Sequence, residues 1–497
     1  MANLIQALRP ILIPVDAMLI LILCGWCASD PVGFDAFIGW ISVAIFLAYF
    51  ALMIFSDNRI FPKLPIVLSA ELSFSIFYFV IFYMPYVRDL LGIGHYWSSS
   101  MISKTFPWNG NKAILISTAA YVSFHLGILI AGRVPPLLRY SVQKREAVGA
   151  YNKFDWMVLF LLGSVILLIM GAGIKSADTD RYGLTHAQAV AASSSGGSAI
   201  ADNIYVVTII LCIVAVSRIV TAIARRGSLS PALIGLLAVV LFWSMRSIAS
   251  GDRNNFLLIA LAAAGGCAAF VKRIRWSAVI VGVIVLFVGY QVVEITRSFD
   301  ASKGESEIEA IDKYITESND VDDNGSFGNT TITLRAMFDI VPSKRPYGFG
   351  YYKMVGFSGI VPLVRGFVLN PKDKITTTAD ALTLYILGPN AVWNTGSNLI
   401  SDIYMDFGLW GVPVLIAGIG FVLQSSRNSI VKNGLTSKRA FVYIVLLASI
   451  SEIPRYSFDF PVRMFVWGWA MFAIYEGVFL RHKPEHNQIR PPHVDMG

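Results

Sequence analysis

Long apolar stretches alternate with short polar connections along most of this chain. About 20 mostly apolar residues are needed for a helix to cross the ~30 Å hydrocarbon core of a bilayer. Twelve stretches meet this length, beginning near Ile11, Phe34, Leu64, Ala113, Asp155, Ile204, Pro231, Asn255, Trp276, Phe407, Ala440 and Phe460. The pattern predicts an all-α polytopic membrane protein with about 12 transmembrane helices.

Composition supports the membrane assignment and excludes other classes. Of the 497 residues, 55% are hydrophobic and only 14% are charged, whereas about a quarter of the residues of a soluble chain are charged. A cytosolic enzyme, a disordered protein and a secreted disulfide scaffold are therefore excluded. The first apolar stretch is followed by no small-residue cleavage site, so we expect a retained anchor and not a signal peptide.

Lys and Arg gather in alternate connections, with clusters at 133–153, 272–275 and 427–439. Positive residues near the ends of spans are retained on the cytoplasmic side. We therefore expect both termini to lie in the cytoplasm. The net charge of +8 follows mostly from this topology and needs no nucleic-acid partner to explain it.

Two connections on the outer side are longer than the rest, and long loops usually carry function. The first is the loop 175–203, which belongs to a region 1–295 with the first nine helices. The second is the large loop 296–406, followed by the last three helices in 407–480 and a cytoplasmic tail, 481–497. Within the large loop, we expect a turn-rich acidic stretch over 319–329 and a short helix over 333–340 that Pro342 stops.

Arginines are frequent at or near the outer ends of the predicted spans. They are Arg181, Arg246, Arg253, Arg297, Arg335, Arg345, Arg365, Arg455 and Arg463. An ion near a bilayer is costly and is usually paired or placed on a substrate path. Guanidinium suits bidentate binding of phosphate, so a lipid-linked phosphate or diphosphate is a fitting ligand. The alternative is that each arginine is an anchor at the membrane interface or a partner in an ion pair.

A carboxylate pair stands where the large loop meets the tenth predicted span. Asp402 and Asp406 are four residues apart and therefore share one helical face. Like charges at this spacing favour a retained proton on one carboxyl unless an arginine neutralises it, which suits a general base or a cation partner. The alternative is a helix start capped by Ser or Asn, with its acids in the first turns. His186, close to Arg181, is a further candidate base, whereas His125 is expected to pack against or bond to a neighbouring helix.

Motifs for metals and nucleotides are absent from the sequence. The chain contains no GxGxxG after a strand, no GxxxxGK[ST] and no HExxH. The segment 320–325 begins like a calcium loop, but Thr331 stands where such a loop needs a bidentate Glu. A solvated acidic turn is the default interpretation. We expect no bound metal and no cofactor.

Several short motifs resemble those of one membrane-protein family. The spacing of Ser397-Asn398, Asp406, Gly408 and Gly411 is similar to the His-Asn…Glu-x-Gly-x-x-Gly pattern of O-antigen ligases and polymerases. The segments 347–352, 360–365 and 370–372 resemble the "YG-x-SY…IPR…P-K-P" segment of Wzy-type oligosaccharide repeat-unit polymerases, and 251–253 resembles their Gly-x-Arg. The chain departs from the ligase-like pattern at Ser397, where that pattern has His. The identity of the base therefore stays open among Asp402, Asp406 and His186.

The resemblance implies a GT-C-like glycosyltransferase of the bacterial inner membrane whose large loop forms a periplasmic domain. Such an enzyme transfers a growing glycan from undecaprenyl diphosphate to a sugar hydroxyl of an incoming lipid-linked repeat unit, in contact with membrane lipid and with a chain-length regulator as a further partner. Candidate diphosphate-binding residues are Arg253, Arg335 and Arg365, then Arg181, Arg345 and Arg455. Candidate glycan-binding residues are Asn398, Tyr347, Tyr351, Tyr352, Trp393 and Tyr404. The aromatic residues fit equally well as a belt at the membrane interface.

Two other functions fit parts of the same pattern. A flippase or transporter of lipid-linked glycan also needs arginines and an apolar groove, but transporters tend to have two similar halves. Here the connections of the first half are all under about thirty residues, whereas the second half contains the loop 296–406 of over a hundred residues. An O-antigen ligase is the other alternative, and Ser397 in place of His counts against it.

Overall fold

The computed structural model describes most of the apolar stretches and part of the large loop. The described residues are 2–57, 69–92, 106–132, 151–172, 196–226, 229–249, 253–271, 326–358, 360, 377–388, 395–450, 453 and 459–480. All regular structure within these ranges is helical, as the sequence predicts.

The described helices follow the predicted apolar stretches in order. They are α1 (Ala2–Ala28), α2 (Ala36–Asp57), α3 (Ala70–Phe82), α4 (Met84–Leu90), η2 (Pro107–Asn109), α5 (Gly110–Ala131), α6 (Asn152–Gly171), α9 (Gly196–Arg226), α10 (Pro231–Ala249), α11 (Arg253–Phe270), α14 (Ser326–Ile340), α15 (Tyr351–Ser358), α17 (Thr378–Leu387), α18 (Leu399–Asn433), α19 (Ser437–Ser449), α20 (Asp459–Tyr475) and η5 (Glu476–Leu480).

Seven of the described helices are long and apolar enough to cross a membrane, or eight if the bent pair α3–α4 is one span. They are α1, α2, α5, α6, α9, α10 and α18. Three further predicted spans coincide with the shorter helices α11, α19 and α20. The span predicted near Trp276 lies outside the described residues, so the number twelve stays a prediction.

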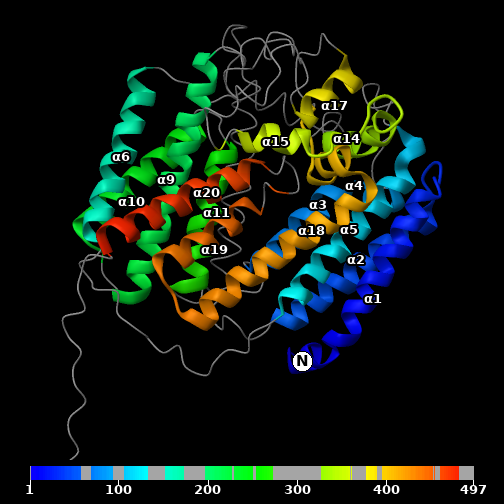
Figure 1. Cartoon of the computed structure of the whole chain (residues 1–497), viewed down its shortest axis with the longest axis horizontal. Coiled ribbons are helices and arrows are strands. Elements are labelled where there is room, and N and C mark those ends of the chain that lie inside the picture. Colours follow the sequence, from blue (N-terminus) through cyan, green and yellow to red (C-terminus); the bar gives the residue numbers. More distant parts are fainter. Residues whose placement is uncertain are drawn as a thin grey trace, which may run out of the picture.

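The helices form two neighbouring groups (Figure 1). In one group, α5 contacts α1, α2 and α18; in the other, α9 contacts α6, α10, α11 and α19. The contact between α18 and α19 joins the groups. The loop helices α14, α15 and α17 lie together at one end of the bundle, and the N-terminus lies at the opposite end (Figure 1). We call these three helices the cap.

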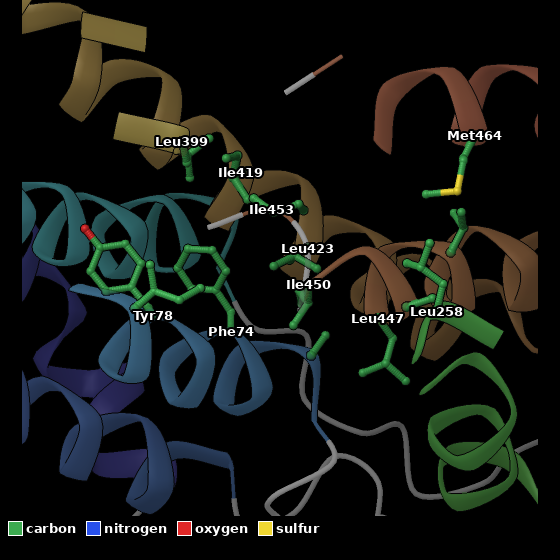
Figure 2. Close-up of a cluster of buried hydrophobic side chains, with 14 of the residues drawn as sticks. Phe74, Tyr78, Leu258, Leu399, Ile419, Leu423, Leu447, Ile450, Ile453 and Met464 are labelled. Carbon is green, nitrogen blue, oxygen red and sulfur yellow. The ribbon is translucent and has the colours of Figure 1, made fainter. Parts of the chain in front are cut away.

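The core runs between the two groups. Figure 2 shows side chains from α3, such as Phe74 and Tyr78, and from α18, such as Ile419 and Leu423, together with side chains from α11, α19 and α20, and all of the labelled residues are buried. Because lipid tails are as apolar as leucine, burial alone holds membrane helices together weakly, and close packing decides which helices meet.

Small residues allow α5 and α18 to approach closely. A Cβ on Gly127 would lie 1.9 Å from the carbonyl oxygen of Ala417, and one on Gly420 would lie 2.1 Å from that of Phe124. Such distances are far inside van der Waals contact, and the obstructing atoms belong to the backbone. Glycine is therefore required on both helices at this crossing.

This crossing gives a direct test of the packing. Gly420→Ala is expected to lower the free energy of unfolding by about 1–3 kcal/mol, because the added methyl group overpacks the crossing. The matched control is Gly418→Ala on the same helix, where a Cβ meets nothing within 4 Å. The apparent melting temperature of the purified protein in detergent measures both variants. Equal melting temperatures for the two variants would contradict the packing argument.

Ionisable side chains inside the bundle are paired across helices. Glu71 of α3 lies 3.2 Å from Arg427 of α18, and Asp155 of α6 lies 2.7 Å from Arg218 of α9. His125 of α5 contacts Asp16 of α1 at 2.8 Å, which confirms that this histidine bonds to a neighbouring helix. Removing one partner from such a buried pair leaves an uncompensated charge, so these pairs fix which helices are neighbours.

Two expectations for the large loop change with the structure. The helix predicted over 333–340 ends at Ile340 as expected, but it begins at Ser326. The turn-rich stretch predicted over 319–329 is therefore wrong for residues 326–329, which are helical; residues 319–325 lie outside the described ranges. The early start has a tertiary cause, because α14 packs against α3, α17 and α18, and this packing extends the helix beyond its amphipathic part.

Candidate functional site

The start of α18 lies at the junction between bundle and cap. Asn398 is its N-cap: its side-chain oxygen accepts a hydrogen bond from Ser401 N at 2.9 Å. Its amide Nδ2 donates to Ser401 Oγ at 2.8 Å and to Thr333 Oγ1 of α14 at 3.1 Å. Asn398 therefore fixes both the beginning of α18 and its contact with the cap.

The helix that contains the tenth predicted span begins before its apolar stretch. The apolar stretch begins near Phe407, whereas the helix begins at Leu399, about two turns earlier, and its helical backbone is broken at Gly408. The physical reason is the Asn398 cap, and the result matches the alternative of a capped helix start with acids in its first turns. Asp402 and Asp406 therefore lie on α18 and not before it.

A single lysine binds both carboxylates. Lys353 of α15 forms an ion pair with Asp402 and lies with its Nζ 3.6 Å from Asp406 Oδ2. The same Nζ donates to the backbone carbonyl of Asp402 at 2.8 Å. The exposed fractions are 7% for Lys353, 3% for Asp402 and 0% for Asp406. We call this group the Asp402–Lys353–Asp406 cluster. The neutralising cation is thus a lysine, where the sequence suggested an arginine.

The two carboxylates differ in their other partners. Asp402 Oδ1 accepts a hydrogen bond from Thr378 Oγ1 of α17 at 2.7 Å. Asp406 instead accepts from two backbone groups in the first turn of α15, Tyr352 N at 3.2 Å and Lys353 N at 3.1 Å. Asp406 therefore caps the N-terminus of α15, whereas the Asp402 carboxylate accepts from the side chains of Thr378 and Lys353. This difference makes Asp402 the better candidate for chemistry.

The turn before α15 wraps around Asp406. Gly348 N donates to Met405 O at 2.9 Å, and Phe349 N donates to Asp406 O at 2.8 Å. A Cβ on Gly348 would lie 2.3 Å from Asp406 Oδ1, so only glycine permits this approach. The matching break on α18 is Gly408, whose φ of +69° favours glycine. The motif glycines on both segments therefore bring the carboxylate to the helix end.

Several of the predicted glycan-binding residues gather beside the cluster. The rings of Tyr347 and Tyr404 are 6.1 Å apart, and those of Tyr351 and Tyr352 are 5.6 Å apart. Arg345 donates from Nη1 to the Tyr352 hydroxyl at 3.4 Å. Tyr404 is buried, whereas the others are half-buried. Besides Lys353, a second cation, Arg345, and a group of tyrosine rings thus lie near the two carboxylates.

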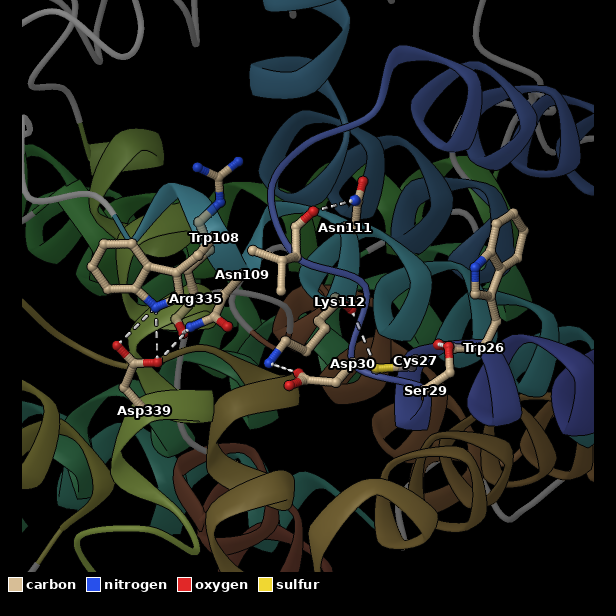
Figure 3. A network of polar contacts seen from close by, with 11 residues as sticks. Trp26, Cys27, Ser29, Asp30, Trp108, Asn109, Asn111, Lys112, Arg335 and Asp339 are labelled. Carbon is tan, nitrogen blue, oxygen red and sulfur yellow. Dashed lines mark hydrogen bonds and ion pairs between the residues drawn. The ribbon is translucent and has the colours of Figure 1, made fainter.

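Arg335 lies away from the cluster, where α14 of the cap packs against α4 of the bundle. Its side chain is fully buried, with Nε donating to the Tyr86 hydroxyl at 3.1 Å and the guanidinium 4.9 Å from the Tyr86 ring centre. Figure 3 shows the polar network around it, in which Asn109 bonds to the Arg335 carbonyl at 3.0 Å and to Asp339 at 2.8 Å. Arg335 therefore holds α14 against α4 in this arrangement.

Most of the remaining candidate site residues lie in parts of the chain that the structure does not describe. Arg181, His186, Arg365, Trp393 and Arg455 lie outside the described residues. Arg253 is the first residue of α11. Within the described ranges, no group of three or more His, Cys, Asp or Glu side chains is arranged to hold a metal ion. Independence from metals stays a prediction.

Sequence reasoning missed Lys353 and Thr378. Lys353 carried a signal, because it is a charge near the start of a further segment rich in apolar residues, 351–369, and such a charge is usually paired. Thr378 carried none beyond its place in the first turn of α17, where a capping box of Thr377 and Asp380 begins the helix.

The profile of one protein family matches most of the chain. It describes the O-antigen polysaccharide polymerase Wzy family, and the match runs over residues 36–478, from the start of α2 past the end of α20. The chain belongs to this family. Comparison with the curated proteins and with the solved structures gives no match.

As a member of the Wzy family, the protein is a multi-pass membrane protein and an O-antigen repeat-unit polymerase. Membership does not identify its lipid-linked donor or its topology. The family acts on lipid-linked oligosaccharide repeat units. Membership favours the polymerase over the ligase and the flippase, which fitted parts of the same sequence pattern. The roles of individual residues do not follow from membership and are argued from the geometry.

Proposed function

We propose that this polymerase extends a glycan at the cap end of the bundle, with undecaprenyl diphosphate as the leaving group. The observation that carries the proposal is the Asp402–Lys353–Asp406 cluster, which joins α15 to the capped start of α18. The cap lies at the end opposite the N-terminus (Figure 1). If the N-terminus is cytoplasmic, as the positive-inside pattern predicts, this end faces the periplasm of the inner membrane.

Asp402 is the proposed base. The acceptor hydroxyl oxygen attacks the anomeric carbon of the lipid-linked chain, the bond from that carbon to the diphosphate oxygen breaks, and undecaprenyl diphosphate leaves with the electron pair. The hydroxyl proton passes to the Asp402 carboxylate. Thr378 Oγ1 now donates to Asp402 Oδ1 at 2.7 Å, and a sugar hydroxyl is a donor of the same kind. The acceptor hydroxyl takes the place of Thr378 in this proposal.

Asp406 and Lys353 position the base. Asp406 is held by two backbone N–H groups of α15, so its carboxylate fixes the place of the Lys353 backbone. Lys353 Nζ in turn contacts Asp402. Orientation by such a buried, fully bonded group keeps a catalytic side chain in the geometry that the reaction needs.

Arginine is proposed to stabilise the charge that develops on the departing diphosphate. Arg345 is half-buried and lies beside Tyr352, so it is the described arginine best placed for this role. Sequence adds Arg181, Arg253, Arg365 and Arg455 as further proposals, whereas the buried Arg335 supports the fold of the cap. Tyr347, Tyr351 and Tyr352 offer faces on which sugars stack. A chain-length regulator stays a proposed partner.

The test uses the purified protein in nanodiscs with defined undecaprenyl-diphosphate-linked repeat units. We expect a ladder of extended glycan and release of one undecaprenyl diphosphate for each bond formed. Arg345→Gln is expected to lower the rate about 10- to 100-fold. The matched control is Lys344→Gln, because Lys344 is the adjacent cation and its Nζ contacts the Tyr385 ring instead. Extension from a nucleotide sugar without the lipid-linked donor would overturn the proposal.

A further inference from the structure

A cavity with charged side chains in its lining lies at the end of the bundle away from the cap. It has a volume of about 410 Å³ and is lined by side chains from the end of α18, the start of α19, and α20 with η5. Because α18 continues from its break at Gly408 to Asn433, at about 1.5 Å per residue, this cavity is remote from the Asp402–Lys353–Asp406 cluster. It therefore has no part in the proposed transfer reaction.

The cavity carries net positive charge. Among its lining residues, Lys438 and Arg439 are cationic and Glu476 is the one anion. Lys438 Nζ lies 3.6 Å from Glu476 Oε2, and both side chains are partly exposed, 24% and 31%. A solvated pair of this kind is weak, so Lys438 is able to exchange Glu476 for a stronger acceptor. One positive charge remains uncompensated among the lining side chains.

The start of α19 adds a second source of positive potential. Thr436 is the N-cap residue of α19. The first turn of this helix holds no acidic residue but contains Lys438 and Arg439. Basic residues are unfavourable at this end, because the backbone N–H groups of a helix N-terminus already carry partial positive charge. An anion bound here is stabilised by the helix and by both side chains.

Hydrogen-bond donors in the cavity are available to such an anion. Arg439 uses only Nη1 for its bonds to the carbonyls of Asn433 and Gly434, and a guanidinium has five N–H donors. Ser426 is a further, half-buried lining residue, and its hydroxyl makes no hydrogen bond within the described part of the chain. These groups match the several acceptor oxygens of a phosphate.

The cavity also borders an exposed aromatic side chain. Trp469 of α20 is 44% exposed, and its ring lies 4.4 Å from Lys438 Nζ. Tryptophan is enriched at the membrane interface. The apolar side chain of Val442 lines the same cavity. A phosphate bound here therefore has a wall beside it on which an acyl chain can pack.

We propose that this cavity binds the phosphate headgroup of an anionic membrane phospholipid. Basic pockets between transmembrane helices bind lipid headgroups of this kind. If the proposed orientation is right, the lipid belongs to the cytoplasmic leaflet. It joins α18, α19 and α20 at the end of the bundle opposite the polymerising site.

The experiment measures lipid binding to the full-length protein in detergent by native mass spectrometry. Dioleoylphosphatidylglycerol is the probe, and dioleoylphosphatidylcholine is the neutral comparison. Lys438→Gln is expected to weaken binding of the anionic lipid about tenfold, the usual effect of losing one charge-assisted hydrogen bond. The matched control is Lys432→Gln, at an exposed position in the last turn of α18 outside the cavity lining, which is expected to change binding little.

A second variant, which is expected to tighten lipid binding, distinguishes loss of the site from loss of structure. Glu476→Gln removes the carboxylate that competes for Lys438, so it is expected to tighten binding several-fold, which an unfolded protein cannot do. Inorganic phosphate tests the source of the anion. Binding of phosphate that depends on Lys438, with no preference for phosphatidylglycerol, would overturn the lipid as ligand. Equal effects of Lys438→Gln and Lys432→Gln would overturn the site altogether.

Discussion

Asp402→Asn is expected to abolish chain extension, lowering the rate by about 10²-fold or more. The amide keeps the shape of the side chain and the acceptor oxygen for Thr378, but it cannot accept a proton from a sugar hydroxyl. Loss of a positioned base costs about 10²–10⁴-fold. The readout is a gel of surface polysaccharide from a deletion strain that carries the variant. We expect a single repeat unit in place of the ladder.

Two comparisons separate catalysis from folding in this experiment. Asp30→Asn is the control, because Asp30 is a carboxylate near the same end whose side chain is 69% exposed and pairs with Lys112; its ladder is expected to be normal. The amount of Asp402→Asn protein in the membrane is measured on the same samples. A normal ladder from Asp402→Asn would show that Asp402 is not the base and would leave Asp406 and His186 as candidates.

Much of the fold follows from the sequence because it depends on local pattern. The apolar stretches predict the helices in order, and Pro342 predicts the end of α14 at Ile340. The spacing of Asp402 and Asp406 predicts one shared face, and the structure places both carboxylates against Lys353. These features need only helical periodicity and the chemistry of helix ends.

The rest depends on contacts between distant segments. Lys353 meets Asp402 across 49 residues of chain, and no local pattern indicates which charge will neutralise which. The same is true of Arg335, which sequence alone assigns to a ligand and which the fold buries against Tyr86, 249 residues away. A charge near a membrane is predicted to be paired, but the partner is set by tertiary packing.

Glycines show how the two levels meet. The resemblance to the family rests partly on Gly408 and on the segment 347–352, and the structure gives both a physical role. Gly408 breaks α18 directly after the carboxylate pair, with the ring of Tyr347 3.1 Å from where its Cβ would be. Gly348 admits Asp406 to the start of α15. The motif therefore marks the place where two backbones approach each other around a carboxylate.

Lys353→Met is expected to destabilise the protein more than any other single substitution in the site. The lysine is 7% exposed and contacts both Asp402 and Asp406, which are also buried. Its removal leaves two like charges close together without a cation. Breaking a buried ion pair in this way costs about 3–5 kcal/mol. We expect a lower melting temperature in detergent, less protein in the membrane and no polysaccharide ladder.

A double substitution and a matched lysine distinguish this cause from general damage. Adding Asp402→Asn to Lys353→Met removes one of the two uncompensated charges, so it is expected to restore part of the lost melting temperature while the ladder stays absent. Lys112→Met is the control, because Lys112 pairs with an exposed carboxylate that water solvates after the change. If the double variant melts no higher than Lys353→Met alone, repulsion between the two carboxylates is not what Lys353 relieves.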